Sequence, residues 1–398
     1  MWPRVAVALC FGWLCLSCRA FKVVWNGPSD RCASRYNVSI PFSQYGIKTN
    51  RKQRFYGDKI VLFYHPDLGH YPYVDSTGRI VHGGIPQRAN LTAHLKAMSR
   101  DIRRAIPDVA FSGLAVIDWE GWQPLWKANW ASRRVYQKLS VKFAKRKRRH
   151  SKHHPRKIRQ YARREFNKAA KLFLLATLSI AKQLRPRARW GFYGYPICSF
   201  NAFSGVCSAK TKKINRKWRW LFDASKALFP SIYLKRSHNQ RPPGDTHLYI
   251  QAILLEALWA ARKNRNPIYP YTTFAYALYE TTLDFYSKAD LCNSLKQSAD
   301  LGASGAVLWS SYTAVSTKTG CEQINDYVVD LLGPYSLIVC DQALRCSQKW
   351  CTEHGRCVTE PHKHCATVSA FEQYHCRCKD PYRGSHCQKK RTLRRSLA

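Results

Sequence analysis

Residues 111–126, FSGLAVIDWEGWQPLW, decide the fold, because an apolar run ends there abruptly in Asp118-Trp119-Glu120. An apolar run of this kind is typical of a buried strand. Burying a carboxylate there costs free energy, so two acids at its end indicate a functional reason. Side chains alternate along a strand, so Asp118 and Glu120 point to one side and Trp119 to the other. The sequence therefore predicts two acids sharing one small site at a strand end.

Paired acids of this kind suit the cleavage of a glycosidic bond. Two close carboxylates push each other's pKa apart, so that one of them keeps a proton and can act as general acid. The alternative is a pair of exposed acids at a strand-to-loop junction, because charged residues gather at the ends of elements. Other parts of the chain decide between these interpretations.

Strand-like and helical segments alternate through most of the chain. After an arm at residues 21–58 that we expect to be irregular, strands are expected at 59–64, 114–120, 190–196, 231–234, 268–274 and 305–311. Helical patterns lie between them at 91–106, 131–184, 248–262 and 284–302. This alternation predicts an α/β fold with a parallel sheet, most simply a barrel, whose active residues lie at the C-terminal strand ends. Side chains at or near those ends are Asp118, Glu120, Tyr193, Tyr233 and Trp309.

The first 20 residues have the pattern of a cleaved export signal. A short basic segment leads into an apolar stretch that ends at Cys18, two residues before Ala20, and the stretch is too short to span a membrane. An uncleaved anchor is the alternative. We expect a soluble, exported protein, with Asn37 and Asn90 as acceptors for glycosylation in their Asn-x-Ser/Thr sequences.

The cysteines also indicate export. The signal contains three of the 16, and the odd number that remains leaves one cysteine outside the intramolecular pairs. The tail has the spacing Cys346-x4-Cys351-x5-Cys357 and Cys376-x-Cys378-x8-Cys387, which resembles an epidermal-growth-factor-like (EGF-like) module. Interleaved histidines allow a zinc site instead, but an oxidising compartment favours disulfides.

The charge is extreme, with 66 Lys and Arg against 24 Asp and Glu and a net charge of +42. Such a protein binds polyanions at low salt. Because the protein is expected to be exported, its expected polyanionic partners are sulfated or carboxylated polysaccharides. The sequence lacks the signatures of common nucleic-acid-binding folds. The basic run at 142–164 is interpreted either as a solvated helix face or loop, or as a tether for such polymers.

The motifs DWE at 118–120, WGFYGYP at 190–196, SIYL at 231–234 and AVLW at 306–309, with the cysteine-rich tail, resemble animal hyaluronidases of glycoside hydrolase family 56. The resemblance covers residues 24–387. It implies a distorted TIM-like (β/α) barrel with fewer than eight strands, followed by the EGF-like module. Family members cleave the β-1,4 bond between N-acetylglucosamine and glucuronate in hyaluronan, and often chondroitin more slowly.

The resemblance also implies roles for the motif residues. Glu120 matches the general acid that later activates water, and Asp118 matches the group that holds the substrate's N-acetyl group. The acetamido oxygen itself attacks the anomeric carbon, so no protein nucleophile is needed. The expected substrate-binding aromatics, each of which could instead serve core packing, are Tyr71, Tyr193, Tyr233 and Trp309.

The same resemblance implies a set of disulfides. In the barrel these are Cys32 with Cys321 and Cys198 with Cys207. In the tail they are Cys346 with Cys357, Cys351 with Cys376, and Cys378 with Cys387. It leaves three cysteines unassigned, at Cys292, Cys340 and Cys365.

Two features depart from the family pattern. Gln123 stands where many members have Arg, and the loss of that cation is expected to weaken a charge contact within or near the cleft and so to lower the rate. The basic insert at 142–164 is also atypical of the family. It is interpreted as a tether to the matrix or as an extension of the cleft's cationic rim.

We therefore expect a signal peptide at 1–20, a catalytic barrel at 21–339 that carries the insert, an EGF-like module at 340–387 and a basic tail at 388–398. The expected activity is retaining hydrolysis of hyaluronan by a monomer that needs no cofactor and no metal. Secretion and lysosomal delivery are both compatible with the signal. The alternatives are a hydrolase that prefers chondroitin and a non-catalytic protein that binds anionic glycosaminoglycans; a nucleic-acid partner is not expected.

Overall fold

The computed structural model describes residues 20–147, 154–199, 201–276, 279, 283–362, 364–365 and 371–391. The expected signal peptide lies outside the described residues except for Ala20. Residues 148–153 of the basic insert and 392–398 of the tail are also outside them.

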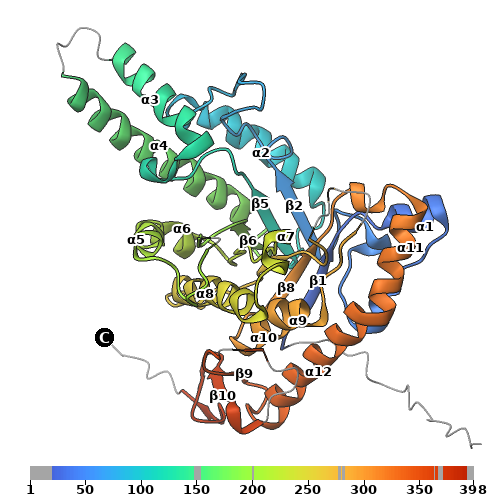
Figure 1. Ribbon diagram of the computed structural model, residues 1–398. Helices are drawn as coiled ribbons and strands as arrows, with labels where there is room; N and C mark the ends of the chain where they lie inside the picture. The colour runs from blue at the N-terminus through green and yellow to red at the C-terminus, as the bar shows by residue number, and fades with distance from the viewer. Residues whose placement is uncertain are drawn as a thin grey trace, which may run out of the picture.

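Two three-stranded parallel sheets form the wall of a barrel (Figure 1). One has the order β1 (Lys22–Asn26), β8 (Gly305–Trp309) and β7 (Tyr271–Thr272), and the other β2 (Ile60–Tyr64), β5 (Leu114–Asp118) and β6 (Arg189–Phe192). Their strands read as nearly continuous apolar runs, because both faces of such a sheet are buried. The predicted α/β barrel is therefore present, and among the described residues its wall has fewer than eight regular strands.

Single bridges, rather than regular strands, join the two sheets. Phe229 pairs with Tyr193 after β6, and Ser231 pairs with Tyr271 of β7. The strand expected at 231–234 forms no more than this bridge. Pro230 precedes it and has no backbone N–H to donate, which disfavours a continuous ladder.

The irregular arm expected at 21–58 is the main error in the predicted fold. Its first segment, β1, pairs along its whole length with β8, and Val23 and Trp25 are buried in the core. The apolar run in β1 is short and is followed by polar residues, so nothing local identifies it. Its ladder partner lies near the other end of the chain.

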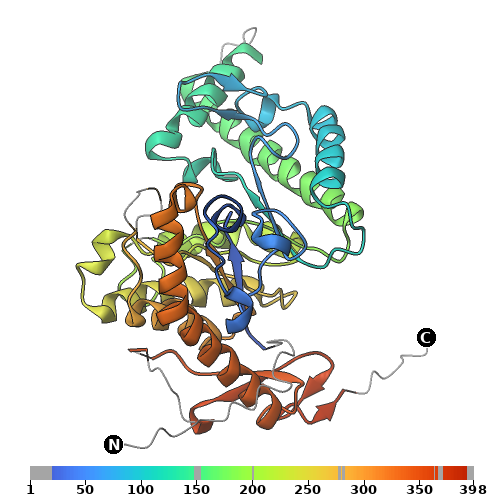
Figure 2. The ribbon, with the colours of Figure 1, turned by 90° about the vertical axis from the view of Figure 1, so that its right-hand side faces the viewer.

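Helices cover the outside of the barrel (Figures 1 and 2). Four of them occupy the first half: α1 (Asp30–Tyr36), α2 (Leu91–Ala105), α3 (Arg134–Lys147) and α4 (Pro155–Leu184). The second half contains α5 (Ala209–Lys217), α6 (Arg219–Ala224), α7 (Arg236–Asn239), α8 (Pro243–Ala261), α9 (Lys288–Leu291), the π-helical turn η6 (Cys292–Lys296), α10 (Gln297–Asp300), α11 (Lys318–Tyr327) and α12 (Gly333–Lys349). The helix α3 and the start of α4 form a hairpin that projects from the barrel and carries the described part of the basic insert.

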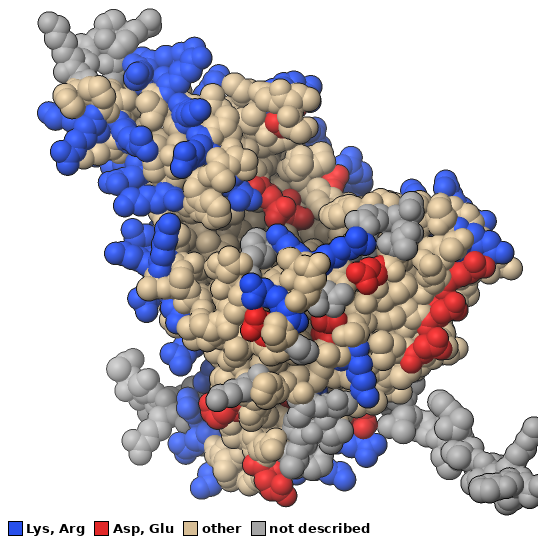
Figure 3. Space-filling model, viewed as in Figure 1, with Lys and Arg blue, Asp and Glu red and all other residues tan. Residues whose placement is uncertain are grey.

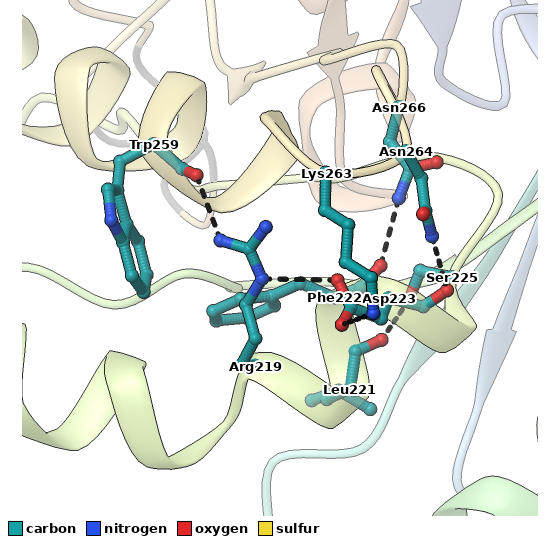
Figure 4. Close-up of polar contacts among 9 residues, drawn as sticks. All are labelled: Arg219, Leu221, Phe222, Asp223, Ser225, Trp259, Lys263, Asn264 and Asn266. Carbon is teal, nitrogen blue, oxygen red and sulfur yellow. Dashed lines mark hydrogen bonds and ion pairs between the residues drawn. The ribbon is translucent and has the colours of Figure 1, made fainter.

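Polar contacts join α6 to the segment after α8 (Figure 4). Asp223 accepts hydrogen bonds from Arg219 Nε and Lys263 Nζ, each at 3.1 Å. Asn264 Nδ2 donates to the Asp223 carbonyl at 2.7 Å, and Asn266 Nδ2 donates to the Phe222 carbonyl at 2.8 Å. These contacts hold together two segments that lead to neighbouring parts of the barrel wall, at 228 and 268.

The tail is a small disulfide-linked module below the barrel (Figure 2). It contains β9 (Gly355–Val358) paired with β10 (His375–Cys378), and β11 (Tyr382–Arg383) paired with β12 (Lys389–Lys390). Arg356 donates to Ser304 Oγ at 2.8 Å, and Thr359 N donates to the Asp300 carbonyl at 2.9 Å. Ser304 precedes β8, so the module docks at the N-terminal end of that strand.

The expected boundary between barrel and module falls inside α12, which runs through residue 340 without a break. The Cys340 sulfur is buried 3.5 Å from the Phe21 carbonyl, so this part of the helix packs on the barrel. The resemblance of the module to epidermal growth factor stays a prediction.

Six disulfides are formed in the described part of the chain. Five are the pairs given above for the barrel and the tail. The sixth joins Cys292 of η6 to Cys365, two of the three cysteines that the sequence left unassigned, and links the barrel to the tail.

Asn50 fixes the start of β2, the strand that ends in the candidate site. Its side chain is 1% exposed and accepts hydrogen bonds from the backbone N–H groups of Lys59 and Ile60, at 2.9 and 3.0 Å. Its Nδ2 atom donates to three backbone carbonyls. One side chain thus satisfies five buried or partly buried backbone groups.

We therefore expect Asn50→Ala to lower the free energy of unfolding by about 2–4 kcal/mol, because those groups lose their partners. Denaturant unfolding followed by tryptophan fluorescence measures the loss. Asp58→Ala, in the same loop but exposed, is the control and should cost less than about 1 kcal/mol. Equal losses in the two variants would contradict the anchoring role of Asn50.

Candidate active site

A cavity of about 520 Å³ opens at the C-terminal ends of the barrel strands. Figure 3 shows acidic side chains gathered in a hollow near the centre of this face. The cavity brings together all six site residues predicted from the sequence, namely Tyr71, Asp118, Glu120, Tyr193, Tyr233 and Trp309.

The end of β5 places the two acids. Asp118 is its last residue and Glu120 follows two positions later, and both side chains border the cavity. Trp119 between them points into the core, where its ring stacks on Tyr71 with centroids 4.8 Å apart and lies 5.8 Å from Phe192. The alternation expected for a strand therefore continues past Asp118, and the buried indole anchors both acids.

The two acids have different surroundings. Asp118 is partly buried and Glu120 is exposed. Burial, followed by the negative charge of Glu120, raises the pKa of Asp118 to about 8. Its Oδ1 atom is buried and has no hydrogen-bond partner among the described residues. Near neutral pH, Asp118 is thus predominantly protonated and has an unused acceptor.

Tyr71 borders the cavity mainly as a packing residue. It is 1% exposed, and its hydroxyl accepts a hydrogen bond from the backbone N–H of Trp122 at 3.1 Å. Gly121 lies against it, since a Cβ atom there would be 3.1 Å from the Tyr71 hydroxyl and 3.0 Å from the Tyr136 hydroxyl. Tyr71 therefore holds the segment that follows Glu120 in place.

Aromatic rings form much of the remaining wall of the cavity. Tyr233 and Trp309 are stacked with ring centroids 6.3 Å apart, and the Tyr193 hydroxyl donates to Ser231 Oγ at 3.1 Å. Trp309 Nε1 donates to the Tyr64 hydroxyl at 3.1 Å, which fixes the plane of the indole. The wall thus offers broad apolar faces with hydroxyl groups between them.

Sequence reasoning missed several cavity residues, among them Tyr64, Tyr271 and Tyr279. Tyr64 is the last residue of a strand that was expected, so the rule that found Asp118 could have found it. Tyr271 lies in β7, within the segment expected at 268–274. No local feature of the sequence indicated that Tyr279 would line the cavity.

Arg133 was also missed. Its Nε atom donates to the backbone carbonyl of Glu120 at 3.1 Å. Burial raises the pKa values of Tyr71 and Tyr195, and the positive charge of Arg133 opposes both shifts. A cation therefore lies close behind the acid, supplied by the start of the α3 region.

Gln123, the residue that departs from the family pattern, does not line the cavity. Its Oε1 atom accepts a hydrogen bond from the Tyr195 hydroxyl at 3.0 Å. Its backbone N–H donates to Asn129 Oδ1 at 2.8 Å, and Asn129 Nδ2 donates back to its carbonyl at 2.9 Å. Gln123 belongs to a neutral network behind the acids, and its effect on rate stays a prediction.

The predicted glycosylation acceptors are both exposed. Asn37 follows α1, and Asn90 caps α2 by accepting a hydrogen bond from the Ala93 N–H at 3.0 Å through Oδ1. Within the described residues, no cluster of three or more His, Cys, Asp or Glu side chains is arranged to hold a metal ion. None of the helices in that part of the chain is long and apolar enough to cross a membrane.

Comparison with known proteins gives consistent matches. Residues 13–391 match the family model described as hyaluronidase, glycoside hydrolase 56. The chain is 37% identical to hyaluronidase-1 of Mus musculus over 351 residues, covering 87% of this chain and 75% of that protein. It is 36% identical to hyaluronidase-3 of Sus scrofa over 420 residues, covering 98% of each. The crystal structure of bee venom hyaluronidase in complex with a hyaluronic acid tetramer superposes with a TM-score of 0.72 at 35% identity, covering 79% of this chain and 98% of that one.

The raised pKa of Asp118 predicts a pH-dependent difference in stability between the wild type and Asp118→Asn. The folded protein binds this proton more tightly than the unfolded chain, whose Asp pKa is about 3.9. The resulting stabilisation is complete below about pH 4 and is lost as pH rises towards 8. Asp118→Asn should therefore gain stability relative to the wild type as pH rises across this range, by up to about 1.4 kcal/mol for each pH unit.

Thermal unfolding of both proteins at several pH values between 4 and 8.5 measures this difference. Asp326→Asn removes one exposed acid on α11 and serves as the control. A gap between wild type and Asp118→Asn that does not change with pH would contradict the burial argument.

Proposed function

The chain belongs to the hyaluronidases of glycoside hydrolase family 56, and from this we propose that it hydrolyses the β-1,4 N-acetylglucosaminyl bonds of hyaluronan by a retaining, substrate-assisted mechanism. One observation carries the proposal. Two acids from a single strand end, one partly buried and one exposed, share with several aromatic residues a cavity of sugar-binding size.

Asp118 is suited to holding the substrate's acetamido group. Its buried Oδ1 acceptor lacks a partner, and an amide N–H is the donor that an N-acetyl sugar would bring. A hydrogen bond from this N–H to Asp118 favours the carboxylate, and so does positive charge developing on the acetamido group as its oxygen attacks. Asp118 would then orient the substrate's own nucleophile.

Glu120 is suited to proton transfer to the leaving oxygen. It is exposed to the cavity, where a glycosidic oxygen would have access to it. A substrate that stabilises ionised Asp118 releases the Asp118 proton within the site, beside Glu120. We infer that this proton then resides on Glu120, which donates it to the leaving group and later removes a proton from the attacking water.

The aromatic wall is suited to binding the sugar. The stacked Tyr233 and Trp309 rings offer apolar surface to the acetamido methyl group and to a pyranose face. Tyr193 is held by Ser231 at the same wall, with its hydroxyl near the acids, whose charges contribute to its raised pKa after the larger effect of burial. These residues would position the sugar without taking part in proton transfer.

We propose that the enzyme is exported, as its paired cysteines and the signal pattern at 1–20 suggest. Extracellular release and lysosomal delivery both fit this route.

Replacing the general acid should stop turnover while the fold is preserved. We expect Glu120→Gln to lower kcat on hyaluronan by about 10²–10⁴-fold, because an amide cannot donate the proton. Reducing ends released from purified hyaluronan measure the rate, with Glu322→Gln on the exposed face of α11 as the control. Substantial turnover by Glu120→Gln would refute the assignment, and wild-type protein that releases no reducing ends would favour a purely binding role.

Substrate preference needs a direct comparison, because the net charge of +42 also suits sulfated polymers. We expect the wild type to cleave hyaluronan faster than chondroitin or chondroitin sulfate of matched length, because the described lining of the cavity is largely aromatic and contains no Lys or Arg to bind sulfate. Side-by-side digestion at low and physiological salt tests this. A chondroitin rate above the hyaluronan rate in both salts would assign the enzyme to the alternative substrate.

A further inference from the structure

A second concavity, of about 790 Å³, lies along α3, with walls from residues 126–130 and from α4. Six of its side chains are central to what it can bind, namely Trp130, Arg134, Lys138, Lys142, Lys145 and Arg159. We call it the α3 groove. It shares no lining residue with the catalytic cavity.

The cations of the α3 groove form a regular row. Four of them, Arg134, Lys138, Lys142 and Lys145, recur three or four residues apart and so lie on one face of the helix. Eleven residues of α-helix place the first and last about 16 Å apart along the axis. Figure 3 shows Lys and Arg gathered over this projecting hairpin. The row matches a linear chain of anions better than a single anion.

The row has no neutralising acids of its own. All five groove cations are exposed, and within the described residues none of them is within ion-pair distance of a carboxylate. The helix α3 contains no acidic residue at all. Like charges at this spacing repel one another, and binding a polyanion relieves that repulsion.

An exposed aromatic residue distinguishes the groove from a plain basic patch. Trp130 is 62% exposed although it is one of the largest apolar side chains. Such a ring beside the cations can stack on the face of a pyranose while the lysines bind its charged groups. This combination favours a charged polysaccharide over inorganic phosphate.

The groove is built beside the catalytic cavity. The connection from β5 to α3 supplies Glu120 and Gly121 to the cavity, and Trp126 and Trp130 to the groove. Asn129, also in the groove, is hydrogen-bonded to Gln123 behind the acids. A polymer held in the α3 groove would keep the enzyme next to the matrix that contains its substrate.

We propose that the α3 groove is an exosite for sulfated glycosaminoglycan chains, separate from catalysis. Hyaluronan carries a single carboxylate per disaccharide and no sulfate, whereas heparin-like chains carry several anionic groups in the same length. The density of cations over about 16 Å fits the sulfated polymer. This inference does not depend on the catalytic roles of Asp118 and Glu120.

The test compares two triple variants with the same change in charge. The groove triple, Lys138→Ala/Lys142→Ala/Lys145→Ala, removes three of the four cations of the row. The α5 triple, Lys210→Ala/Lys213→Ala/Lys217→Ala, removes three exposed lysines from α5. Fluorescence anisotropy with a labelled heparin oligosaccharide of defined length, at two salt concentrations, gives Kd. We expect the groove triple to bind about tenfold or more weakly with a reduced salt dependence, and the α5 triple to stay within about twofold of wild type.

Trp130 supplies a test without a charge change. We expect Trp130→Ala to weaken heparin binding several-fold and Trp130→Phe to retain most of it, because a ring remains to stack on the sugar. Cleavage of a short hyaluronan oligosaccharide should be the same in wild type and in the groove triple, which separates this site from the catalytic one.

Three outcomes would overturn the proposal. Equal loss of heparin affinity in both triples would show that only net charge matters. Equal affinity of the wild type for hyaluronan of the same length would remove the preference for sulfate. Equal affinity for a DNA duplex of similar charge, lost in the same way in the groove triple, would remove the selectivity for polysaccharide.

Discussion

The pairing of β5 between β2 and β6 is the constraint on which the site depends. It sets Asp118 opposite Tyr64 and Ile117 opposite Phe192, so one register fixes both the acids and part of the aromatic wall. A slip of one residue would turn Trp119 into the cavity and bury the carboxylates. The buried indole, packed on Tyr71 and Phe192, makes that slip costly and holds the acids in the cavity.

The site combines groups that the fold alone would not favour. A partly buried carboxyl with an unpaired acceptor lowers the free energy of unfolding at pH values above the pKa of a free Asp. The same burial gives that carboxyl the proton and the unused acceptor on which the proposed chemistry relies. Around it, Tyr64, Ser231 and the Arg133 guanidinium satisfy or orient groups at the cavity wall. Asp118 is thus locally destabilising, while the groups around it have hydrogen-bond partners.

Negative and positive charges are divided between the two ends of the segment that connects β5 to α3. The acids lie at its start, in a partly buried cavity, and the cations lie beyond it on an exposed helix, in water. Exposed charges of this kind act over about 8–10 Å at physiological salt, so the row on α3 influences where a polymer binds more than how it reacts. The large positive charge of the chain is compatible with two acids in the cavity because the two sets of charges are separated in this way.

Much of this could be predicted from the sequence. An apolar run that ends in Asp118 and Glu120, the alternation of strands and helices, and the family motifs specified the barrel, the acid pair and most of the aromatic wall, because strand ends and side-chain alternation are local properties of the chain. Tertiary structure alone decided that residues 22–26 form a barrel strand, that Cys292 joins Cys365, and that Arg133 lies behind Glu120. It also decided that the raised pKa belongs to Asp118 and that Trp130 lies beside a row of cations. Each of these depends on partners or burial supplied by other segments, often distant ones, and no local pattern records which segments will meet.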